Sequence, residues 1–152
     1  MKIYIGCPIQ GFNNKEWQKH WSELETLKNS LRKIGHEILD FKSNEKKQAE
    51  PGTVFKWDHE QCMNCDAMIA IALGPSTGMG MEIGMCLKRT RGQDNSPSPA
   101  FVFATAPHST NVSRMITECN LPNFVFERCD SFTEIPEKFE KAYKESVRNT
   151  HK

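Results

Sequence analysis

Apolar residues follow two different spacings along the chain. Between residues 15 and 34 they recur every three or four positions, which places one apolar stripe along a helix. Gly35 follows this segment directly, where a glycine commonly ends a helix. The run from Ala67 to Leu73 is continuously apolar, as in a parallel strand that is buried on both faces. The two spacings together predict a protein of helices and parallel strands.

The alternation of strand and helix continues along the chain. We predict strands at 2–6, 37–41, 67–73, 100–105 and 123–127, and helices at 15–34, 53–64, 81–89, 112–119 and 132–143. Thr53 is expected to cap the second helix, and the polar segments 43–52 and 92–99 are expected to be loops. This order predicts one doubly wound α/β domain over residues 1–152. Its five-stranded parallel sheet is of flavodoxin-like or Rossmann-like type, with helices on both faces.

Ligands of doubly wound sheets bind outside the carboxyl ends of the strands, near the point where the strand order reverses. Three segments of this chain follow predicted strands at that edge. They are residues 6–14, residues 74–82 and the loop after Thr105. We therefore expect the functional residues to lie in or beside these segments.

Charge and hydropathy restrict the classes of partner. The chain has 20 Lys and Arg against 19 Asp and Glu, and the basic residues are scattered. Binding to nucleic acid or to a membrane surface usually needs a concentrated basic patch, so neither partner is expected. No apolar run is long enough to span a bilayer, and the N-terminus has no signal-peptide pattern. A cytoplasmic protein with six reduced cysteines is expected.

Cys62 and Cys65 form a Cys-x-x-Cys pair. Zinc binding would need two further ligands, and neither a second such pair nor a His-x3-His follows. A thioredoxin-like redox pair would stand at a helix N-terminus, whereas this pair ends a predicted helix. The favoured interpretation is that both thiols are small apolar residues at a helix end.

The segment from Gly74 to Gly84 is rich in glycine and carries two hydroxyl groups, those of Ser76 and Thr77. Glycine lets backbone N–H groups approach a ligand closely, and a helix N-terminus favours an anion. A phosphate or a sugar suits this chemistry. The spacing of the glycines matches neither the dinucleotide fingerprint nor the P-loop, so a plain strand-to-helix turn is the alternative.

Glu82 is the candidate nucleophile, placed by the pattern in the first turn of the predicted helix 81–89. A carboxylate can capture the anomeric carbon of an N-glycoside, which breaks through an oxocarbenium-like transition state. Met79 and Met81 are expected to keep its surroundings partly dry. Asp58 is the candidate second carboxylate, although the residues alone favour a solvated helix face for Asp58 as they do for His59. The structural alternative for Glu82 is an acidic residue that favours a helix N-terminus.

Three stretches of the chain, 3–9, 58–70 and 75–84, resemble the nucleoside 2-deoxyribosyltransferase superfamily. Within 75–84 the pattern Pro-Ser-x-Gly-x-Gly-x-Glu is most similar to that of the 2'-deoxynucleoside 5'-phosphate N-hydrolases. It also resembles related hydrolases of cytidine monophosphates. The resemblance extends from Lys2 to about Glu127.

The resemblance implies a role for each matched residue. It implies that Glu82 is the nucleophile, that Asp58 is the acid/base or base-orienting carboxylate, and that Tyr4 lies near the sugar and Glu82. It implies that the substrate and its 5'-phosphate contact Gly6, Ile9, Gly11, Ser76, Gly78 and Gly80. It further implies a homodimer in which Ser113 reaches the phosphate in the neighbouring subunit's site. No cofactor and no metal are implied.

The sequence therefore predicts hydrolysis of (deoxy)nucleoside 5'-monophosphates to free base and sugar 5-phosphate. A deoxyribosyltransferase that exchanges bases between nucleosides is the alternative. Pro8 favours the transferase, since the family hydrolases tend to have Ser there and Arg at the position of Gln10. Arg114 is a candidate replacement for that cation. From other classes, a nucleotide-binding sensor that has lost the chemistry and a flavodoxin-like electron carrier are weaker alternatives.

Overall fold

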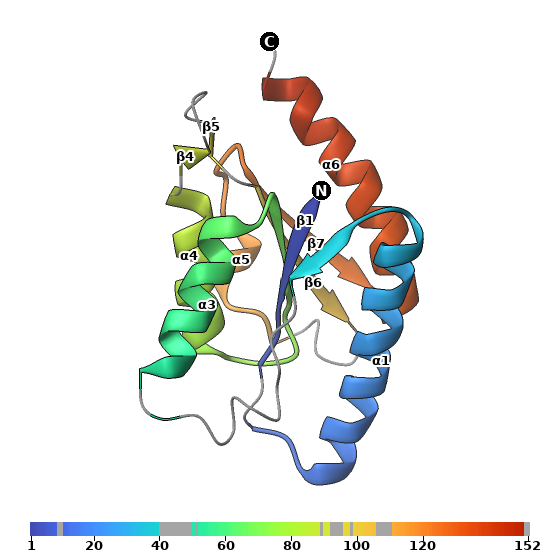
Figure 1. Ribbon diagram of the computed structural model, residues 1–152. Helices are drawn as coiled ribbons and strands as arrows, with labels where there is room; N and C mark the ends of the chain where they lie inside the picture. Colours follow the sequence, from blue (N-terminus) through green and yellow to red (C-terminus); the bar gives the residue numbers. More distant parts are fainter. Residues whose placement is uncertain are drawn as a thin grey trace.

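A five-stranded parallel sheet forms the centre of the protein in the computed structural model (Figure 1). The structure describes residues 1–8, 11–39, 50, 52–88, 90–91, 96–97, 99–105 and 111–150. The strands of the sheet are β1 (Lys2–Gly6), β2 (Glu37–Leu39), β3 (Ala67–Ile71), β6 (Ala100–Thr105) and β7 (Phe124–Cys129). They are hydrogen-bonded in the order β2-β1-β3-β6-β7, and every neighbouring pair is parallel. The predicted doubly wound sheet is confirmed, in its flavodoxin-like form.

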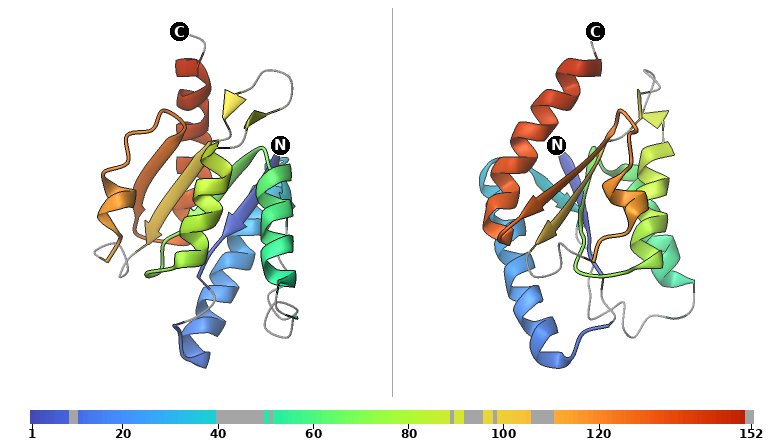
Figure 2. Two further views of the ribbon diagram at one scale, coloured as in Figure 1. Left: turned by 90° about the vertical axis from the view of Figure 1, so that its left-hand side faces the viewer. Right: turned by 180° about the vertical axis from the view of Figure 1, so that it is seen from behind.

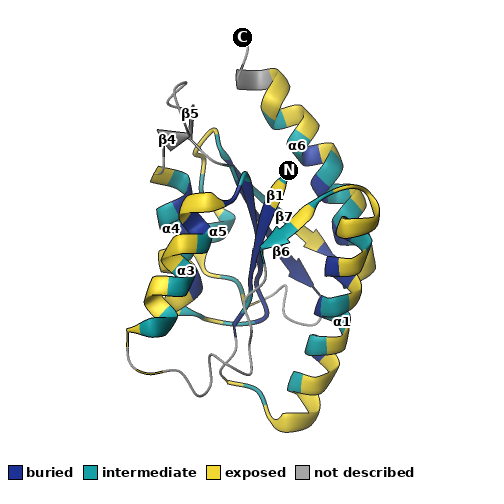
Figure 3. Cartoon of the chain, in the orientation of Figure 1, coloured by how far each residue is buried: buried dark blue, intermediate teal, exposed yellow. Residues whose placement is uncertain are grey.

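Helices cover both faces of this sheet (Figures 1 and 2). One face carries α1 (Asn14–Lys33) and α6 (Ile135–Thr150), which follows the short 3-10 helix η3 (Phe132–Glu134). The other face carries α3 (Thr53–Asn64), α4 (Thr77–Lys88) and the short α5 (Arg114–Thr117). Figure 3 shows the buried strands between two helical layers whose outer surfaces are exposed.

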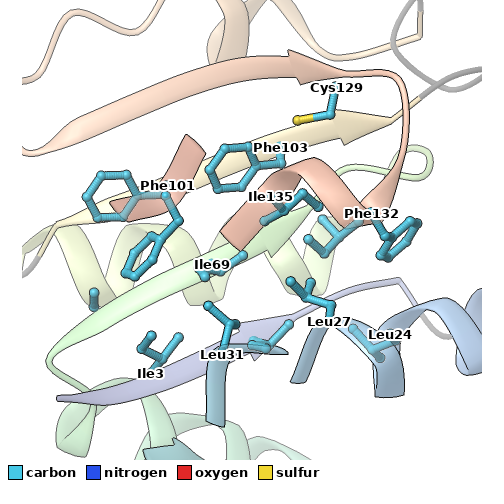
Figure 4. Packing of buried hydrophobic residues seen from close by; sticks show 14 of the residues in the cluster. Ile3, Leu24, Leu27, Leu31, Ile69, Phe101, Phe103, Cys129, Phe132 and Ile135 are labelled. Carbon is cyan, nitrogen blue, oxygen red and sulfur yellow. The ribbon is translucent and has the colours of Figure 1, made fainter. Parts of the chain in front are cut away.

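The hydrophobic core forms two layers because successive strand residues point to opposite faces. In β1, Ile3 and Ile5 pack with the apolar stripe of α1 and with α6, whereas Tyr4 packs on the face that carries α3 and α4. Figure 4 shows the first layer, in which Leu24, Leu27 and Leu31 of α1 lie near Ile69. The side chain of Tyr4 is therefore delivered to the α3–α4 layer by strand alternation alone.

Helix α1 is capped at both ends by local sequence. Asn13 Oδ1 accepts from the N–H of Glu16, whose carboxylate accepts in return from the N–H of Asn13. At the other end Gly35 adopts φ +95°, and the N–H groups of Gly35 and His36 donate to the carbonyls of Arg32 and Leu31. This is a Schellman cap, so the prediction that Gly35 ends the helix is confirmed.

Two predicted helix starts are wrong. Helix α3 is preceded by Gly52 in the left-handed region, with no side-chain cap, so Thr53 is the first helical residue and not the cap. Helix α4 begins at Thr77 instead of residue 81. Ser76 causes this early start, since its Oγ accepts from the N–H of Met79 and its carbonyl accepts from the N–H of Gly80. Glu82 consequently lies in the second turn of α4, not in the first.

Smaller differences concern strand ends and loops. Part of the predicted loop 92–99 is a strand, because β5 (Ser96–Pro97) pairs antiparallel with β4 (Thr90–Arg91). The closing helix extends to Thr150, beyond its predicted end. Several predicted loop residues lie outside the described residues, among them Ile9, Gln10, most of 43–52 and residues 106–110.

The strand order places a crevice at the carboxyl ends of β1 and β3. The chain passes from β1 to β2 on one side and from β3 to β6 on the other, so the direction of winding reverses between β1 and β3. In flavodoxin-like sheets the ligand site lies outside the carboxyl ends of the strands at this reversal. Gly6 ends β1 at this edge, and α4 starts six residues after the end of β3.

Candidate active site

Tyr4 and Asp58 are joined by a hydrogen bond under this edge of the sheet. The Tyr4 hydroxyl donates to Asp58 Oδ1 at 3.1 Å, across 54 residues of sequence. Tyr4 is fully buried in β1, while Asp58 is half-buried in the middle of α3. The bond therefore holds the carboxylate of Asp58, which is only half-buried, against the central strand β1.

Glu82 reaches the same hydroxyl from α4. Its carboxylate is a second hydrogen-bond partner of Tyr4 and raises the pKa of the phenol further through its charge. Glu82 Oε2 also lies over Gly6, because a Cβ built on that glycine would stand 2.8 Å from this oxygen. The structure thus brings together Tyr4, Gly6, Asp58 and Glu82 from three separate elements.

The phenol of Tyr4 stays protonated throughout the useful pH range. Burial raises its pKa far above the usual value of about 10, and the charges of Glu82 and Asp58 raise it further. A phenol has one proton, so it can donate to only one carboxylate oxygen at a time. Tyr4 is therefore a neutral donor shared by two carboxylates that face a common point.

Two groups beside Glu82 were not predicted. The methyl of Met68 would stand 2.7 Å from a Cβ on Gly6, and the Cys62 thiol donates to the Glu82 carbonyl at 3.7 Å. Both belong to the apolar layer that also contains Tyr4. Of the two methionines expected to keep the surroundings of Glu82 partly dry, Met81 is 52% exposed, whereas Met79 is buried in the same apolar layer as Tyr4. Gly6, an expected substrate contact, lies two residues after Tyr4 in β1 and therefore on the same face of the strand.

A cavity of about 830 Å³ lies on the opposite side of α4 from Glu82. Gly80, Gly84 and Leu87 line it, and helical rotation of about 100° per residue turns these positions away from Glu82. The rest of its lining comes mainly from the end of β3 and from α5 and its flanks. No Asp, Glu, His, Lys or Arg belongs to this lining among the described residues. The cavity can bind apolar groups but cannot supply acid–base chemistry, so we assign the chemistry to the carboxylates.

The predicted phosphate contacts lie at several separate places. Ser76 and Gly80 line the cavity. Ser113, which is the N-cap of α5, lines the cavity of its own chain. Gly78 is exposed in the first turn of α4, where the leading N–H groups of a helix have no acceptor within the helix. Gly11 is exposed with φ +92° in the loop after β1. Ile9 lies outside the described residues.

Three further polar residues lie away from the carboxylate pair. Asp66 accepts from the N–H of Lys2 at 2.7 Å and so joins β3 to β1 at the opposite edge of the sheet. His59 is exposed and stacks on Phe55, as expected of a solvated helix residue. Arg114 is exposed and pairs with Glu118 at 3.8 Å, a surface contact worth little.

The described residues contain no group of three or more His, Cys, Asp or Glu side chains arranged to hold a metal ion. Cys62 and Cys65 are both buried and form no disulfide, in agreement with the interpretation that they are small residues at a helix end. In the same part of the chain, every helix is too short or too polar to cross a membrane.

The sequence matches no protein-family profile and no curated protein. Comparison with solved structures finds a chain of similar fold, described as the Clostridium botulinum CMP N-glycosidase BcmB. The two chains share 16% sequence identity with a TM-score of 0.62, over 92% of this chain and 98% of the other. At this identity the likeness establishes that the two proteins share an α/β fold.

Proposed function

We propose that this protein is an N-glycosidase that hydrolyses (deoxy)nucleoside 5'-monophosphates to free base and sugar 5-phosphate. The observation that carries the proposal is the placement of Asp58 and Glu82 on one buried phenol, that of Tyr4. Retaining glycosidases need two carboxyl groups at one site, one as nucleophile and one as acid and base. The CMP N-glycosidase with the same fold supports a nucleotide as the class of substrate.

In the proposed reaction, a Glu82 oxygen attacks C1' of the sugar while the C1'–N bond breaks. Asp58, protonated at this stage, gives its proton to the departing base. The product is a glycosyl ester of Glu82. Asp58 then takes a proton from a water molecule, whose oxygen attacks C1' and releases the sugar with a new hydroxyl. Glu82 regains its negative charge, and Asp58 its proton.

The Tyr4 hydroxyl contributes by donating its hydrogen bond to whichever of the two carboxylates is charged at each step. Its single proton can turn toward Glu82 when that carboxylate is charged, and toward Asp58 once Glu82 has become an ester. Because the phenol is buried, the hydrogen bond acts in a region with little water to screen it. In the charged state the bond also fixes the orientation of the Glu82 carboxylate.

The proposed phosphate site is the N-terminus of α4. The helix end carries partial positive charge, and the N–H groups of Thr77 and Gly78 belong to its first turn. The Ser76 hydroxyl, which accepts from the N–H of Met79, still has its own proton to donate. Ser76 precedes Glu82 by six residues, a rise of roughly 9 Å along the helix axis, and a nucleotide with its sugar at Glu82 would direct its phosphate toward this end.

A panel of substrates tests the proposed function. We expect base release, measured by chromatography, from at least one ribo- or deoxyribonucleoside 5'-monophosphate, and slower release from the matching nucleoside. The difference arises because only the monophosphate occupies the helix N-terminus. Equal rates for both substrates would contradict the phosphate site, and no release from any would contradict the N-glycosidase.

Base exchange between deoxynucleosides is the second candidate function. Pro8 favours it, since proline has neither a hydroxyl nor a backbone N–H to offer a phosphate. Arg114, exposed and paired with Glu118, gives no support to the idea that it replaces the missing cation. Addition of a second free base to the panel separates the two functions, because only a transferase would form a new nucleoside efficiently.

We also propose that two copies of the chain associate through the α3–α4–α5 layer. Five large apolar side chains are exposed on these elements or beside them: Phe55, Met63, Met81, Met115 and Leu121. Met115, which is 86% exposed, also lines the cavity together with Ser113. Burial of this surface against a second copy would remove a large apolar area from water. It would also bring Ser113 toward the neighbouring site.

Sedimentation tests the homodimer. We expect the wild-type protein to have twice the mass of one chain and the Met115→Glu variant to be a monomer, because a charge cannot be buried without a partner. Val147→Glu is the control, since Val147 is exposed on α6, at the other face of the sheet. A monomeric wild-type protein, or equal effects of both variants, would contradict this interface.

A further inference from the structure

Three buried thiols connect α3 to α4 behind the carboxylate pair. The Cys62 thiol donates to the Glu82 carbonyl at 3.7 Å, and the Cys86 thiol donates back to the Cys62 carbonyl at 3.9 Å. Cys65, which caps the end of α3, donates to the same carbonyl at 3.5 Å and lies 3.9 Å from the Cys86 sulfur. All three residues are at most 1% exposed.

The thiols and the carboxylates occupy matching positions on the two helices. Cys62 follows Asp58 by four residues on α3, and Cys86 follows Glu82 by four residues on α4. Residues four apart lie on the same side of a helix, one turn from each other. The contact between the thiols is therefore one helical turn away from the contact that Tyr4 makes with both carboxylates.

The Cys62 carbonyl needs these donors. It belongs to the last four carbonyls of α3, which have no N–H partner within the helix. An unpaired buried carbonyl destabilises the fold, because it has lost its hydrogen bonds to water without a replacement. Two thiols satisfy it, one from the end of α3 and one from α4. The connection between the helices is reciprocal, because Cys62 is donor to α4 through its sulfur and acceptor from α4 through its carbonyl.

The Cys86 thiol is suited to a structural contact and not to reaction. Hydrogen bonds with Cys62 and Cys65 raise the pKa of Cys86 far above its usual range, and burial raises it further. A thiol that does not ionise remains a donor and is a poor nucleophile. Its hydrogen bonds therefore persist at every pH at which the protein is folded.

We propose that the Cys62–Cys65–Cys86 cluster positions Glu82 relative to Asp58 and Tyr4, with Cys62 as the principal positioning residue. The part of this proposal that concerns catalysis rests on the proposed function. Cys62 is bonded to the backbone of the nucleophile itself, so a shift of α4 along α3 would move Glu82 away from the phenol. The attack on C1' tolerates little displacement, and an error of 1 Å can cost about a hundredfold in rate.

The test compares Cys62→Ala, which removes the donor, with Cys62→Ser, which retains one. Cys129→Ala is the control, because Cys129 is also a buried thiol but lies in the other core layer, with its pKa raised to about 11, chiefly by burial. We expect Cys62→Ala to lower kcat about tenfold or more, with KM within about twofold of wild type. Cys62→Ser should recover part of kcat, and Cys129→Ala should leave it unchanged.

A second measurement reports on position without any substrate. The chain has only two tyrosines, Tyr4 and Tyr143, so protein labelled with 13Cζ-tyrosine gives two resonances. The Tyr4 resonance senses the hydrogen bonds of its hydroxyl to Asp58 and Glu82, and Tyr143, on α6, is the internal reference. We expect Cys62→Ala to move the Tyr4 resonance and Cys62→Ser to return it toward its wild-type position.

The outcomes separate the two proposals. A wild-type protein that cleaves no nucleotide or nucleoside would overturn the function, and the Tyr4 resonance would then decide the positioning alone. An unmoved Tyr4 resonance in folded Cys62→Ala would overturn the positioning, whatever the activity. If Cys62→Ala does not fold, Cys86→Ala carries the same test, because it removes the reciprocal bond. Equal losses of kcat in Cys62→Ala and Cys129→Ala would mean that the thiol cluster contributes only to core packing and does not position Glu82.

Discussion

Glu82→Gln is expected to lower base release at least about a thousandfold, because the loss of a covalent nucleophile leaves only the catalysis that binding and electrostatics provide. Glutamine keeps the length of the side chain and can still accept from Tyr4, but its amide oxygen is too weak a nucleophile to capture C1'. Initial rates of base release from the preferred substrate measure the effect. Glu60→Gln, an exposed residue on α3, is the matched control and should keep wild-type activity.

The same variant should be no less stable than the wild type. Glu82 is a half-buried carboxylate that shares one buried hydroxyl, that of Tyr4, with Asp58. Glutamine removes the cost of keeping a charge in this partly desolvated position and still accepts from Tyr4, so the melting temperature of Glu82→Gln should equal or exceed that of the wild type. Such a gain is common where a site has been arranged for function. Full activity in Glu82→Gln would refute the mechanism, and a large loss of stability would make the rate uninterpretable.

Local patterns predicted the order of the elements, and the resemblance to a known family predicted the carboxylate pair. The apolar steps of α1 and the continuous run of β3 each follow from one spacing, and both elements are present within one to two residues of the prediction. The grouping of Tyr4, Asp58 and Glu82, expected from the resemblance, is the grouping that the hydrogen bonds of Tyr4 produce. The local alternation did not choose between flavodoxin-like and Rossmann-like strand orders, which only the pairing of distant strands distinguishes.

The start of α4 was missed for a specific physical reason. Gly78 and Gly80 lower helix propensity and suggested a loop, but Ser76 supplies a cap that offsets part of that cost. The glycines are therefore helical. Glu82 consequently lies in the second turn of α4, whereas the predicted helix start placed it in the first turn. The available signal was the serine directly before the segment, since serine often caps the first turn of a helix. The glycine content of the segment concealed it.

The roles of Cys62 and Met68 had no local signal of this kind. Cys62 contacts Glu82 across 20 residues, and the Met68 methyl lies near the carboxylate only because β3 pairs with β1. Contacts of this type depend on the register of strands and on helix packing, which the spacing of apolar residues does not encode. Gly6 is an intermediate case, since strand alternation places it beside Tyr4 but does not reveal what lies above it.

Gly6→Ala is expected to lower turnover about a hundredfold while the protein stays folded. The new Cβ would stand 2.8 Å from Glu82 Oε2 and 2.7 Å from the Met68 methyl, closer than atoms can pack. Both of these atoms are at the far ends of flexible side chains, so the backbone of β1 need not move. The strain is relieved by displacement of the methionine and of the carboxylate, and the latter is the reacting group.

Gly35→Ala is the matched control, because it should lower stability and leave turnover unchanged. Gly35 ends α1 with φ +95° and open space around its Cα, far from the carboxylates. A side chain there should destabilise the protein by about 1–2 kcal/mol through the left-handed backbone alone, with kcat unchanged. Thermal unfolding and initial rates on both variants then separate the two effects. If Gly6→Ala lost stability and activity in proportion, as a core defect would, Gly6 would be a packing residue. A loss of turnover at wild-type stability would instead mean that glycine is required at position 6 because the Glu82 carboxylate occupies the space that a side chain would fill.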